Sequence, residues 1–232
     1  MKLSIIVPVY NEERTLKDIL IKLAALQSKI NMEIIIIDDG STDNSVNVAK
    51  AFIKLSKNKD ISYKLISKKN MGKGSAVRRG IKEASGDIIT IQDADLEYDP
   101  SDYLSLIAPI INGSSLVVYG SRFLKSHKPL YKVYFLGNKF LSMLTKLLYQ
   151  AQITDMETCY KVFHARTIKS IKLKSNGFDI EPEITAKILK RRIKIKEIPI
   201  SYKPRKVEEG KKINWRDGLR AIWVLFYLRF KD

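Results

Sequence analysis

Two carboxylates close an apolar run that is typical of a buried strand. Asp93 and Asp95 stand two positions apart, with Glu97 and Asp99 close behind. At a strand end both can reach one divalent cation, and hard oxygen ligands suit Mg2+ or Mn2+, which commonly bridge to substrate phosphates. Carboxylates of this spacing also occur in turns and in helix caps, here before Pro100. Because the pair follows an apolar strand, we favour a metal site.

A second apolar run ends in the same way at Asp38 and Asp39. A carboxylate in this position can accept a hydrogen bond from a base N–H or from a ribose hydroxyl. Ser41 and Asp43 are also suited to cap the helix that follows. This motif alone therefore does not separate nucleotide binding from helix capping.

Basic residues occur in several turn-like contexts. The loop 68–74 contains lysines and glycines but lacks the spacing of a P-loop, so it is as typical of a solvated loop as of a phosphate cradle. Arg122, Arg205, Lys211 and Lys212 follow in other turns, and arginine is suited to bidentate phosphate contact. Taken singly, each of them is also explained as a solvated charge.

The remaining reactive residue types do not suggest another chemistry. His127 and His164 stand far apart without metal-ligand spacing, so neither a zinc site nor a catalytic triad is predicted. Cys159 is the only cysteine, which excludes an intrachain disulfide and fits a reducing compartment. We interpret it as a structural thiol.

The elements that must position these residues alternate along the first half of the chain. Strand-like runs over 2–10, 32–39, 61–67 and 86–95 are separated by helical patterns over 12–27, 43–55 and 75–84. This alternation predicts an α/β fold with a mostly parallel central sheet flanked by helices. Ligands bind beyond the carboxyl ends of such strands, so we expect the carboxylates above to share one rim with Tyr10 and Glu12.

The second half is less regular. It contains a strand-like run at 114–122, an amphipathic helix at 137–150, an alternating run at 193–205 and a helix at 215–230. We find no repeat and no convincing boundary, so we expect one domain over residues 1–232.

Size and charge limit the partners. The chain has 232 residues, 45% of them apolar, which is enough for one sizeable core. Its 42 Lys and Arg against 25 Asp and Glu give a formal charge of +17, which attracts nucleic acid, anionic lipid or phosphorylated substrates. No RNA-binding, helix-turn-helix or zinc signature is present, so we do not expect a nucleic-acid partner.

The sequence predicts a soluble or peripheral protein. Its start does not resemble a signal peptide, and the apolar run 221–228 is far shorter than the roughly 18 residues that span a bilayer. The 215–230 helix nevertheless collects apolar residues on one broad face, flanked by arginines: Trp215, Leu219, Ile222, Trp223, Phe226 and Phe230. Such a face fits interfacial membrane binding, and packing on the core is the alternative.

Taken together, these stretches resemble the family-2 glycosyltransferases with the GT-A fold. The resemblance is closest to the polyprenyl- and dolichyl-phosphate sugar synthases, such as the dolichol-phosphate mannose synthases. Five motifs carry it: VPVYNEE at 7–13, IIDDGSTDNS at 36–45, GKGSAVRRGI at 72–81, GDIITIQDADLEYDP at 86–100 and YGSRF at 119–123. It covers nearly the whole chain, and it implies a Rossmann-like nucleotide-sugar-binding half over 1–122 and an acceptor-binding half over 123–232.

The resemblance also implies roles for individual residues. The nucleoside of a nucleotide-sugar donor would be surrounded by Pro8, Tyr10, Glu12, Ile37 and Asp39. The metal and the diphosphate would be held by Asp93, Ala94 and Asp95, with Glu97 as a further metal ligand where relatives often have glutamine. Arg122 would face the acceptor phosphate, and Arg205 with Lys211 would close on the donor diphosphate. Asp95 and Arg122 would be the catalytic residues, and the cofactor would be Mg2+ or Mn2+.

The implied reaction is transfer of a hexose, with inversion, from a donor of the GDP-mannose or UDP-glucose type to a polyprenyl or dolichyl phosphate. A lipid phosphate is already ionised, because its second pKa is about 6, and needs no strong base. The alternative is a family-2 transferase that extends a glycan through a sugar hydroxyl, which requires a base. The candidates for that base are Asp155, Glu157, Glu181 and Glu183.

The acceptor half departs from the family pattern. Residues 154–163 read TDMETCYKVF where many synthases have a glycine-containing segment, and 178–185 carry two glutamates. These differences leave the sugar and the acceptor open. We expect a cytoplasmic protein, peripheral on the cytoplasmic face of a membrane, with a membrane-protein partner as a further possibility.

Overall fold

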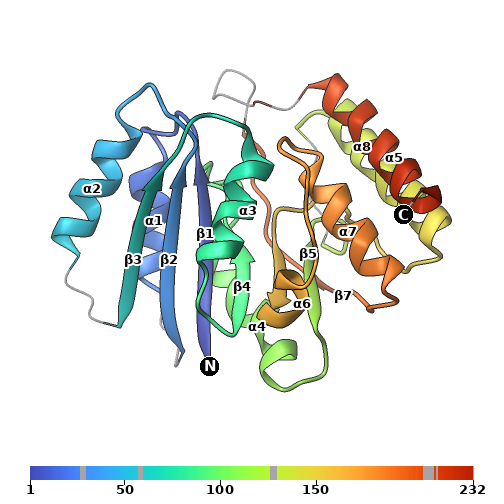
Figure 1. Ribbon diagram of the computed structural model, residues 1–232, viewed down its shortest axis with the longest axis horizontal. Helices are drawn as coiled ribbons and strands as arrows, with labels where there is room; N and C mark the ends of the chain where they lie inside the picture. The colour runs from blue at the N-terminus through green and yellow to red at the C-terminus, as the bar shows by residue number, and fades with distance from the viewer. Residues whose placement is uncertain (27–29, 57–59, 126–129, 206–211, 213, 232) are drawn as a thin grey trace.

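The computed structural model describes residues 1–26, 30–56, 60–125, 130–205, 212 and 214–231. These residues form a single α/β domain around one seven-stranded sheet, ordered β3-β2-β1-β4-β6-β5-β7 (Figure 1). The strands are β1 (Lys2–Val9), β2 (Asn31–Asp38), β3 (Ile61–Ser67), β4 (Ile88–Ile91), β5 (Val117–Ser121), β6 (Lys161–His164) and β7 (Lys196–Pro199). The predicted α/β class with a mostly parallel sheet is confirmed.

The parallel part of the sheet follows directly from the apolar runs. Strand β1 pairs in parallel with β2 on one side and with β4 on the other, and β2 pairs in parallel with β3. The four isoleucines at 34–37 in β2 are fully buried, because helices cover both faces of the sheet. Consequently β1, β2 and β4 end at the same edge.

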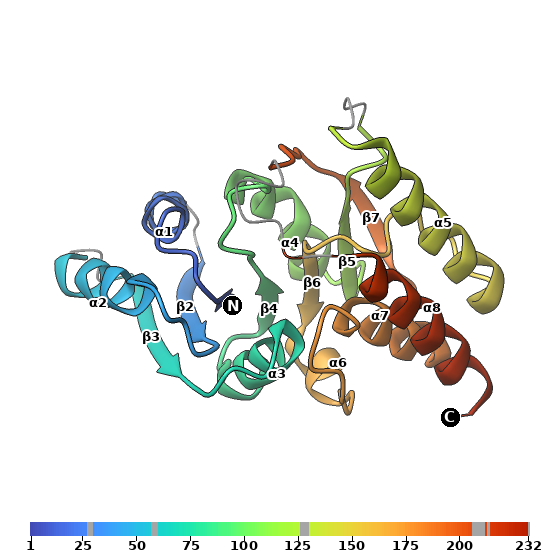
Figure 2. The same cartoon turned by 90° about the horizontal axis from the view of Figure 1, so that it is seen from above.

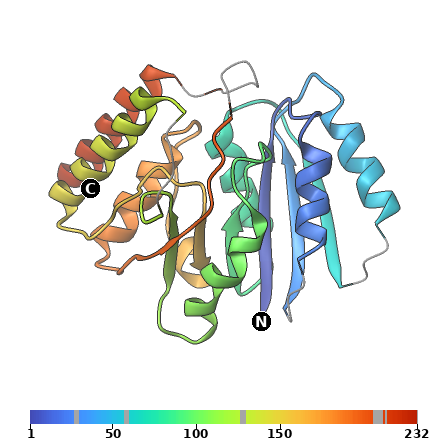
Figure 3. The ribbon, with the colours of Figure 1, turned by 180° about the vertical axis from the view of Figure 1, so that it is seen from behind.

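Helices lie on both sides of this sheet. In the views from above and from behind, α1 and α4 lie on one face and α3 and α6 on the other (Figures 2 and 3). The helices are α1 (Leu16–Ala24), α2 (Ser45–Leu55), α3 (Lys73–Glu83), α4 (Tyr103–Ile111), α5 (Lys132–Tyr149), α6 (Ala165–Lys169), α7 (Ile180–Lys190) and α8 (Trp215–Phe230). In the described residues, no helix is long and apolar enough to cross a membrane.

The second half differs from the sequence prediction in several elements. Strand β6 lies between β4 and β5 and runs antiparallel to both. The sequence pattern predicts neither β6 nor the helices α4, α6 and α7. The β6 run has only four residues, too few for a clear alternation. The predicted helix over 137–150 begins five residues earlier, at Lys132, and the predicted strand over 193–205 is reduced to β7.

The start of α2 also differs from the expected capping. Its N-cap residue is Asn44, rather than Ser41 or Asp43. The Asp43 carboxylate still accepts a hydrogen bond from the Ser45 backbone N–H at 3.0 Å, while the Ser41 hydroxyl accepts one from the Asn11 N–H at 3.0 Å. These polar side chains therefore fasten two neighbouring loops to each other.

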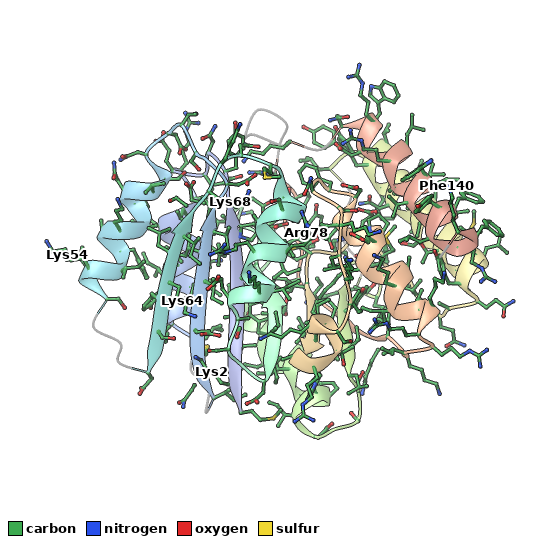
Figure 4. All side chains as sticks on the ribbon, viewed as in Figure 1. Lys2, Lys54, Lys64, Lys68, Arg78 and Phe140 are labelled. Atoms are coloured by element: carbon green, nitrogen blue, oxygen red, sulfur yellow. The ribbon has the colours of Figure 1, made fainter. Side chains whose placement is uncertain are left out.

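The two edges of the parallel sheet are chemically different. Lys2 lies at one edge, where its ammonium contacts the buried Glu33 carboxylate at 2.9 Å. Lys68 lies at the opposite edge (Figure 4). At the Lys2 edge, Glu33 also accepts hydrogen bonds from Ser4 and Ser85, so the polar groups there are satisfied internally. A cavity lined by Asp39, Asp93 and Asp95 lies at the other edge, where β1, β2 and β4 end.

Candidate active site

A cavity of about 370 Å³ lies beyond the carboxyl ends of β1, β2 and β4. Ten of the residues expected to form a site line it: Pro8, Tyr10, Glu12, Asp39, Asp93, Ala94, Asp95, Glu97, Arg122 and Arg205. Ile37 is fully buried within β2 and is not among the lining residues. Lys211 lies outside the described residues.

The turn after β4 directs its carboxylates into the cavity. Leu96 adopts a left-handed backbone conformation with φ 61°, which is costly for a residue with a side chain and is typical of functional sites. The Asp95 carboxylate accepts a hydrogen bond from the Glu97 N–H at 3.2 Å within this turn. On Asp93, the other carboxylate of the pair, an oxygen lies 2.8 Å from the Lys73 ammonium.

Among the described residues, the carboxylates of Asp93, Asp95 and Glu97 outnumber the two cations that contact them, Lys73 and Arg205. Burial, with the nearby Asp93 and Glu97 carboxylates, raises the pKa of Asp95 to about 7. The guanidinium of Arg205, 3.7 Å from Asp95, opposes this rise without cancelling it. A buried carboxyl that resists ionisation beside other carboxylates is a suitable place for an added cation.

The donor set at this turn fits a hard divalent cation with further ligands from substrate. Where the structure describes the chain, no group of three or more His, Cys, Asp or Glu side chains converges as a metal site. Asp93 and Asp95 would therefore supply two carboxylate ligands and leave the other positions to phosphate oxygens and water, as Mg2+ commonly requires.

Glu97 has other partners in this structure. One of its oxygens accepts a hydrogen bond from the Arg205 backbone N–H at 3.0 Å, and the other from the Tyr202 hydroxyl at 2.9 Å. The Lys203 N–H donates to the Glu97 backbone carbonyl at 2.9 Å. Glu97 thus ties the segment 202–205 to the turn that follows β4, and its role as a third metal ligand stays a prediction.

Two late basic residues close one side of the cavity. The Arg205 guanidinium lies 3.3 Å from a Glu12 oxygen, and the Lys212 ammonium lies 2.6 Å from the other. Lys212 also lies over the Tyr10 ring, 5.5 Å from its centre. Arg205 and Lys212, which both follow β7 in the sequence, therefore contact the loop that follows β1.

The carboxyl end of β2 is fixed by the loop 68–72. The Asp39 carboxylate pairs with the Lys68 ammonium and accepts hydrogen bonds from the backbone N–H groups of Met71 and Gly72. Gly72 has φ 98°, a conformation that disfavours residues with a side chain. The basic loop is thus fastened to Asp39 by Lys68 and by two backbone N–H groups, while Lys69 and the Met71 side chain remain exposed.

The start of α3 lies deeper in the cavity. Gly74 approaches the loop 175–177 so closely that an added Cβ would lie 2.6 Å from the Ser175 carbonyl oxygen. This close packing places Lys73 between Asp93 and α7, where its ammonium is also 3.2 Å from Glu181. Burial alone would lower the pKa of Lys73, but the neighbouring carboxylates raise it well above its usual value.

Arg122 is held by a buried carboxylate. Its Nε and Nη2 both donate to Asp155 at 2.7 Å, and its backbone N–H donates to the same carboxylate at 3.0 Å. The guanidinium also lies 5.2 Å from the centre of the Tyr202 ring. Arg122 lines the cavity as expected, but Asp155 fixes its orientation.

Several lining residues were not singled out as donor-site residues from the sequence. They are Val9, Asn70, Gly72, Lys73, Ala76, Tyr98, Glu157, Cys159, Phe178, Glu181 and Lys212. For Lys73, the glycines on both sides are the only sequence signal. Cys159 is buried, with its sulfur 3.8 Å from the Ile91 carbonyl oxygen. His164 ends β6 away from the lining, and His127 lies outside the described residues.

Comparison with known proteins identifies the family. The sequence profile described as Glycosyl transferase family 2 matches residues 4–171, which is well over half of the chain. The chain belongs to glycosyl transferase family 2. A dolichol-phosphate mannosyltransferase of Pyrococcus furiosus is 32% identical over 234 residues, covering 99% of this chain and 62% of the relative. This family-2 chain thus spans less than two thirds of that relative's length.

A second relative matches along nearly its whole length. The UDP-N-acetylglucosamine–dolichyl-phosphate N-acetylglucosaminyltransferase of Methanococcus voltae is 31% identical over 244 residues, covering 97% of this chain and 95% of the relative. The predicted resemblance to family-2 polyprenyl-phosphate sugar synthases is confirmed, and the protein is a glycosyltransferase.

Solved structures of a more distant enzyme share the fold. Glucosyl-3-phosphoglycerate synthase of Mycobacterium tuberculosis bound to UDP superposes with a TM-score of 0.77 at 17% identity, over 98% of this chain and 80% of that chain. The same enzyme with Mn2+, UDP and phosphoglyceric acid gives 0.73 at 17% identity, over 99% and 78%. At this identity the likeness establishes the fold alone, and the expected GT-A fold is confirmed.

Proposed function

We propose that this family-2 protein transfers a hexose, with inversion, from a nucleotide-sugar of the GDP-mannose or UDP-glucose type to a polyprenyl or dolichyl phosphate. The convergence of Asp93, Asp95 and Arg205 in one cavity carries the proposal. Carboxylates for a cation and a guanidinium for phosphate are what a donor diphosphate requires. The names of the two archaeal relatives support the dolichyl-phosphate acceptor.

The donor would lie along the cavity from β2 toward β4. Asp39, Pro8 and Tyr10 border the nucleoside end, where Asp39 is positioned by the loop 68–72. The diphosphate would then lie beside Asp93, Asp95 and Arg205, which line the same part of the cavity. A bound Mg2+ or Mn2+ would supply electrostatic stabilisation of the leaving diphosphate. Arg205 adds a positive charge already in place before the reaction.

The acceptor phosphate would meet Arg122. Asp155 accepts hydrogen bonds from Nε and Nη2, and no described residue accepts one from Nη1. The pair with Asp155 therefore leaves one edge of the guanidinium for a phosphate oxygen and holds it in a fixed orientation. Since a phosphate monoester is already ionised at neutral pH, with a second pKa of about 6, this step needs positioning and no general base.

A paired helix surface, which we call the α5–α8 face, favours a lipid partner. The helices lie side by side at one end of the molecule, and the Tyr149 hydroxyl of α5 donates to the Leu225 carbonyl of α8 at 2.8 Å (Figure 1). The α5–α8 face consists of exposed apolar residues, with Phe140 at the edge of the molecule in Figure 4: Val133, Leu136, Phe140, Met143, Leu147, Trp215, Leu219, Trp223, Phe226, Tyr227 and Phe230.

On both helices, some apolar residues pack on the core and others remain exposed on the α5–α8 face. On α8, core packing uses Ala221, Val224, Leu225 and Leu228, so the aromatic residues remain outside. On α5, Leu144 and Leu148 pack on the core, while Phe140 and Leu147 remain exposed. The two helices carry six Lys or Arg and a single acidic residue, Asp217. Apolar area beside positive charge suits an anionic membrane surface.

Charged substitutions on α8 test this surface. The double variant Trp223→Glu, Phe226→Glu should bind vesicles containing anionic lipid at least about tenfold more weakly than the unchanged protein, because both side chains are exposed and would enter the acyl boundary. Flotation with phosphatidylglycerol vesicles measures this. Leu55→Glu, on exposed α2, is the matched control and should float normally. Unchanged flotation of the double variant would reject the membrane surface.

The proposed reaction is tested by its product. UDP- and GDP-sugars with radiolabelled hexose, offered with polyprenyl phosphate and Mn2+, should give a labelled product that extracts into organic solvent and is acid-labile. The alternative, glycan extension through a hydroxyl, would give a water-soluble or acid-stable product. That alternative is favoured by one observation, an unpartnered cavity carboxyl oxygen at Glu157 among the described residues, which a base could use.

A further inference from the structure

Glu157 is a cavity residue whose side chain has no complete set of partners. It belongs to the segment of the chain between α5 and β6, which departs from the family pattern, and it lines the cavity. Its Oε1 is buried and has no hydrogen-bond partner among the described residues. An unpaired buried polar atom costs free energy, so its presence in a binding cavity points to a ligand that completes it.

The other three carboxylates considered as bases are committed elsewhere. Asp155 accepts three hydrogen bonds from Arg122. Glu181 pairs with the ammonium groups of Lys73 and Lys161. Glu183 is bound by Lys187 at 2.7 Å and by backbone N–H groups of the loop before α7, outside the cavity lining. Oε1 of Glu181 also lacks a hydrogen-bond partner among the described residues, but the Lys73 ammonium lies 3.2 Å from it. Glu157 is the lining carboxylate whose Oε1 has neither a hydrogen-bond partner nor an ion pair in the described part of the chain.

Glu157 lines the cavity among charged groups of the acceptor half and the end of β5. The charges that act most strongly on it come from Lys161, Glu181, Arg122 and Asp155, and none of these belongs to the metal-binding turn. Burial, the largest effect, raises the pKa of Glu157 to about 7, so the carboxyl can either accept or donate a hydrogen bond near neutral pH.

An aromatic ring borders the same region. Phe178 lines the cavity, and its ring centre lies 5.9 Å from the Lys73 ammonium, which itself contacts Asp93 at 2.8 Å. The wall therefore continues from the carboxylates that would hold the diphosphate, through Lys73, to Phe178 and Glu181. In a nucleotide-sugar the hexose follows the diphosphate, so this end is where the hexose would lie.

We propose that Glu157 binds a hydroxyl group of the donor hexose, and that with Phe178 it selects which hexose this enzyme transfers. The inference rests on the proposed function and deepens it. A carboxyl group can contact two neighbouring hydroxyls, and the apolar face of a hexose can pack on an aromatic ring. A buried group that loses its hydroxyl partner discriminates strongly against the wrong sugar.

The test separates the sugar from the rest of the donor. Glu157→Ala and Glu157→Gln are compared with the unchanged protein for binding of UDP-glucose, UDP-N-acetylglucosamine and GDP-mannose, and of free UDP and GDP, all with Mn2+, by calorimetry. For whichever nucleotide-sugar the unchanged protein prefers, affinity should fall ~10–100-fold in Glu157→Ala, the range expected for a charged hydrogen bond. Affinity for the free nucleoside diphosphate should stay within about twofold, and the preference among the sugars should narrow.

Two further measurements keep the outcomes distinct. Glu157→Gln keeps the shape and one acceptor oxygen, so it should lose less affinity than Glu157→Ala. Glu83→Ala, on the outer part of α3 and paired with Arg79 at 3.0 Å, is the matched control and should bind all ligands normally. The melting temperature of each variant checks folding.

Three results would overturn the inference. Equal loss of nucleoside diphosphate and nucleotide-sugar affinity would show a structural role. Unchanged sugar binding with a reduced kcat, and loss of a pH dependence centred near the Glu157 pKa of about 7, would make Glu157 a general base for a hydroxyl acceptor. If the unchanged protein bound no nucleoside diphosphate at all, the proposed function itself would fail and the inference with it.

Discussion

Replacing Asp95 by asparagine should lower the rate of sugar transfer by ~10²–10³-fold, the usual effect of removing one preorganised electrostatic contact to developing charge. The substitution keeps the size of the side chain but removes one of the two cavity carboxylates, Asp93 and Asp95, that we propose hold the cation. Donor binding that depends on Mn2+ should be lost together with turnover. Steady-state assays of transfer, with calorimetry of nucleoside diphosphate with and without Mn2+, measure both effects.

The pH dependence of Mn2+ binding gives this prediction a second readout. The raised pKa of Asp95, about 7, means that the carboxyl holds a proton below neutral pH in the metal-free protein. Since a metal ligand must be deprotonated, Mn2+ affinity of the unchanged protein should fall from about pH 8 to about pH 6, and Asp95→Asn should remove most of that dependence. Asp18→Asn, on α1 outside the cavity lining, should behave as the unchanged protein. Full activity in Asp95→Asn would falsify the mechanism.

The part of the site that the sequence predicted is the part carried by strand ends. Parallel pairing fixes where β1, β2 and β4 end, so Tyr10, Asp39 and Asp93 had to meet at one edge once the alternation of strands and helices was recognised. The run of four isoleucines at 34–37 favours a buried strand, because β-branched residues are enriched in strands. For this half of the molecule, the pattern of residue types is nearly sufficient to predict both the parallel strands and the residues that meet at their ends.

The acceptor half depends on contacts between segments that are distant in the sequence. The first turn of α7 contains Glu181 and Glu183, which the sequence offered as candidate bases. In the structure both are buried, and Lys73, Lys161 and Lys187 pair with them. Such pairs cannot be predicted from the local periodicity of the sequence, because Lys73 and Lys161 are distant in the chain from Glu181. The antiparallel strand β6 was missed for a similar reason, since its position depends on pairing with β4 and β5 rather than on its own four residues.

The Arg122–Asp155 pair combines a residue that a local sequence motif predicts with a partner that only the folded structure reveals. The sequence placed Arg122 in the site through its motif, but offered no partner for it. The structure adds a fully buried Asp155 whose backbone N–H is itself bound to Glu197 at 2.9 Å. This couples the end of β5 to the segment before β6 and to β7, so that the orientation of the proposed phosphate-binding residue is set by the acceptor half.

Arg122→Ala should therefore affect folding and activity together. Leaving the Asp155 carboxylate buried without its guanidinium should lower the free energy of unfolding by about 3–5 kcal/mol, because breaking a buried pair from one side leaves an uncompensated charge. Urea denaturation measures this loss. The double variant Arg122→Ala, Asp155→Asn should regain much of the stability, since neither charge then remains, but it should not regain transfer if Arg122 contacts the acceptor. Recovery of both stability and transfer would show that the pair is structural alone.

Arg122→Lys completes the series: it keeps the charge but cannot make the bidentate contact. We therefore expect a raised KM for polyprenyl phosphate and an unchanged affinity for the donor nucleotide, a split that a loss of folding cannot produce.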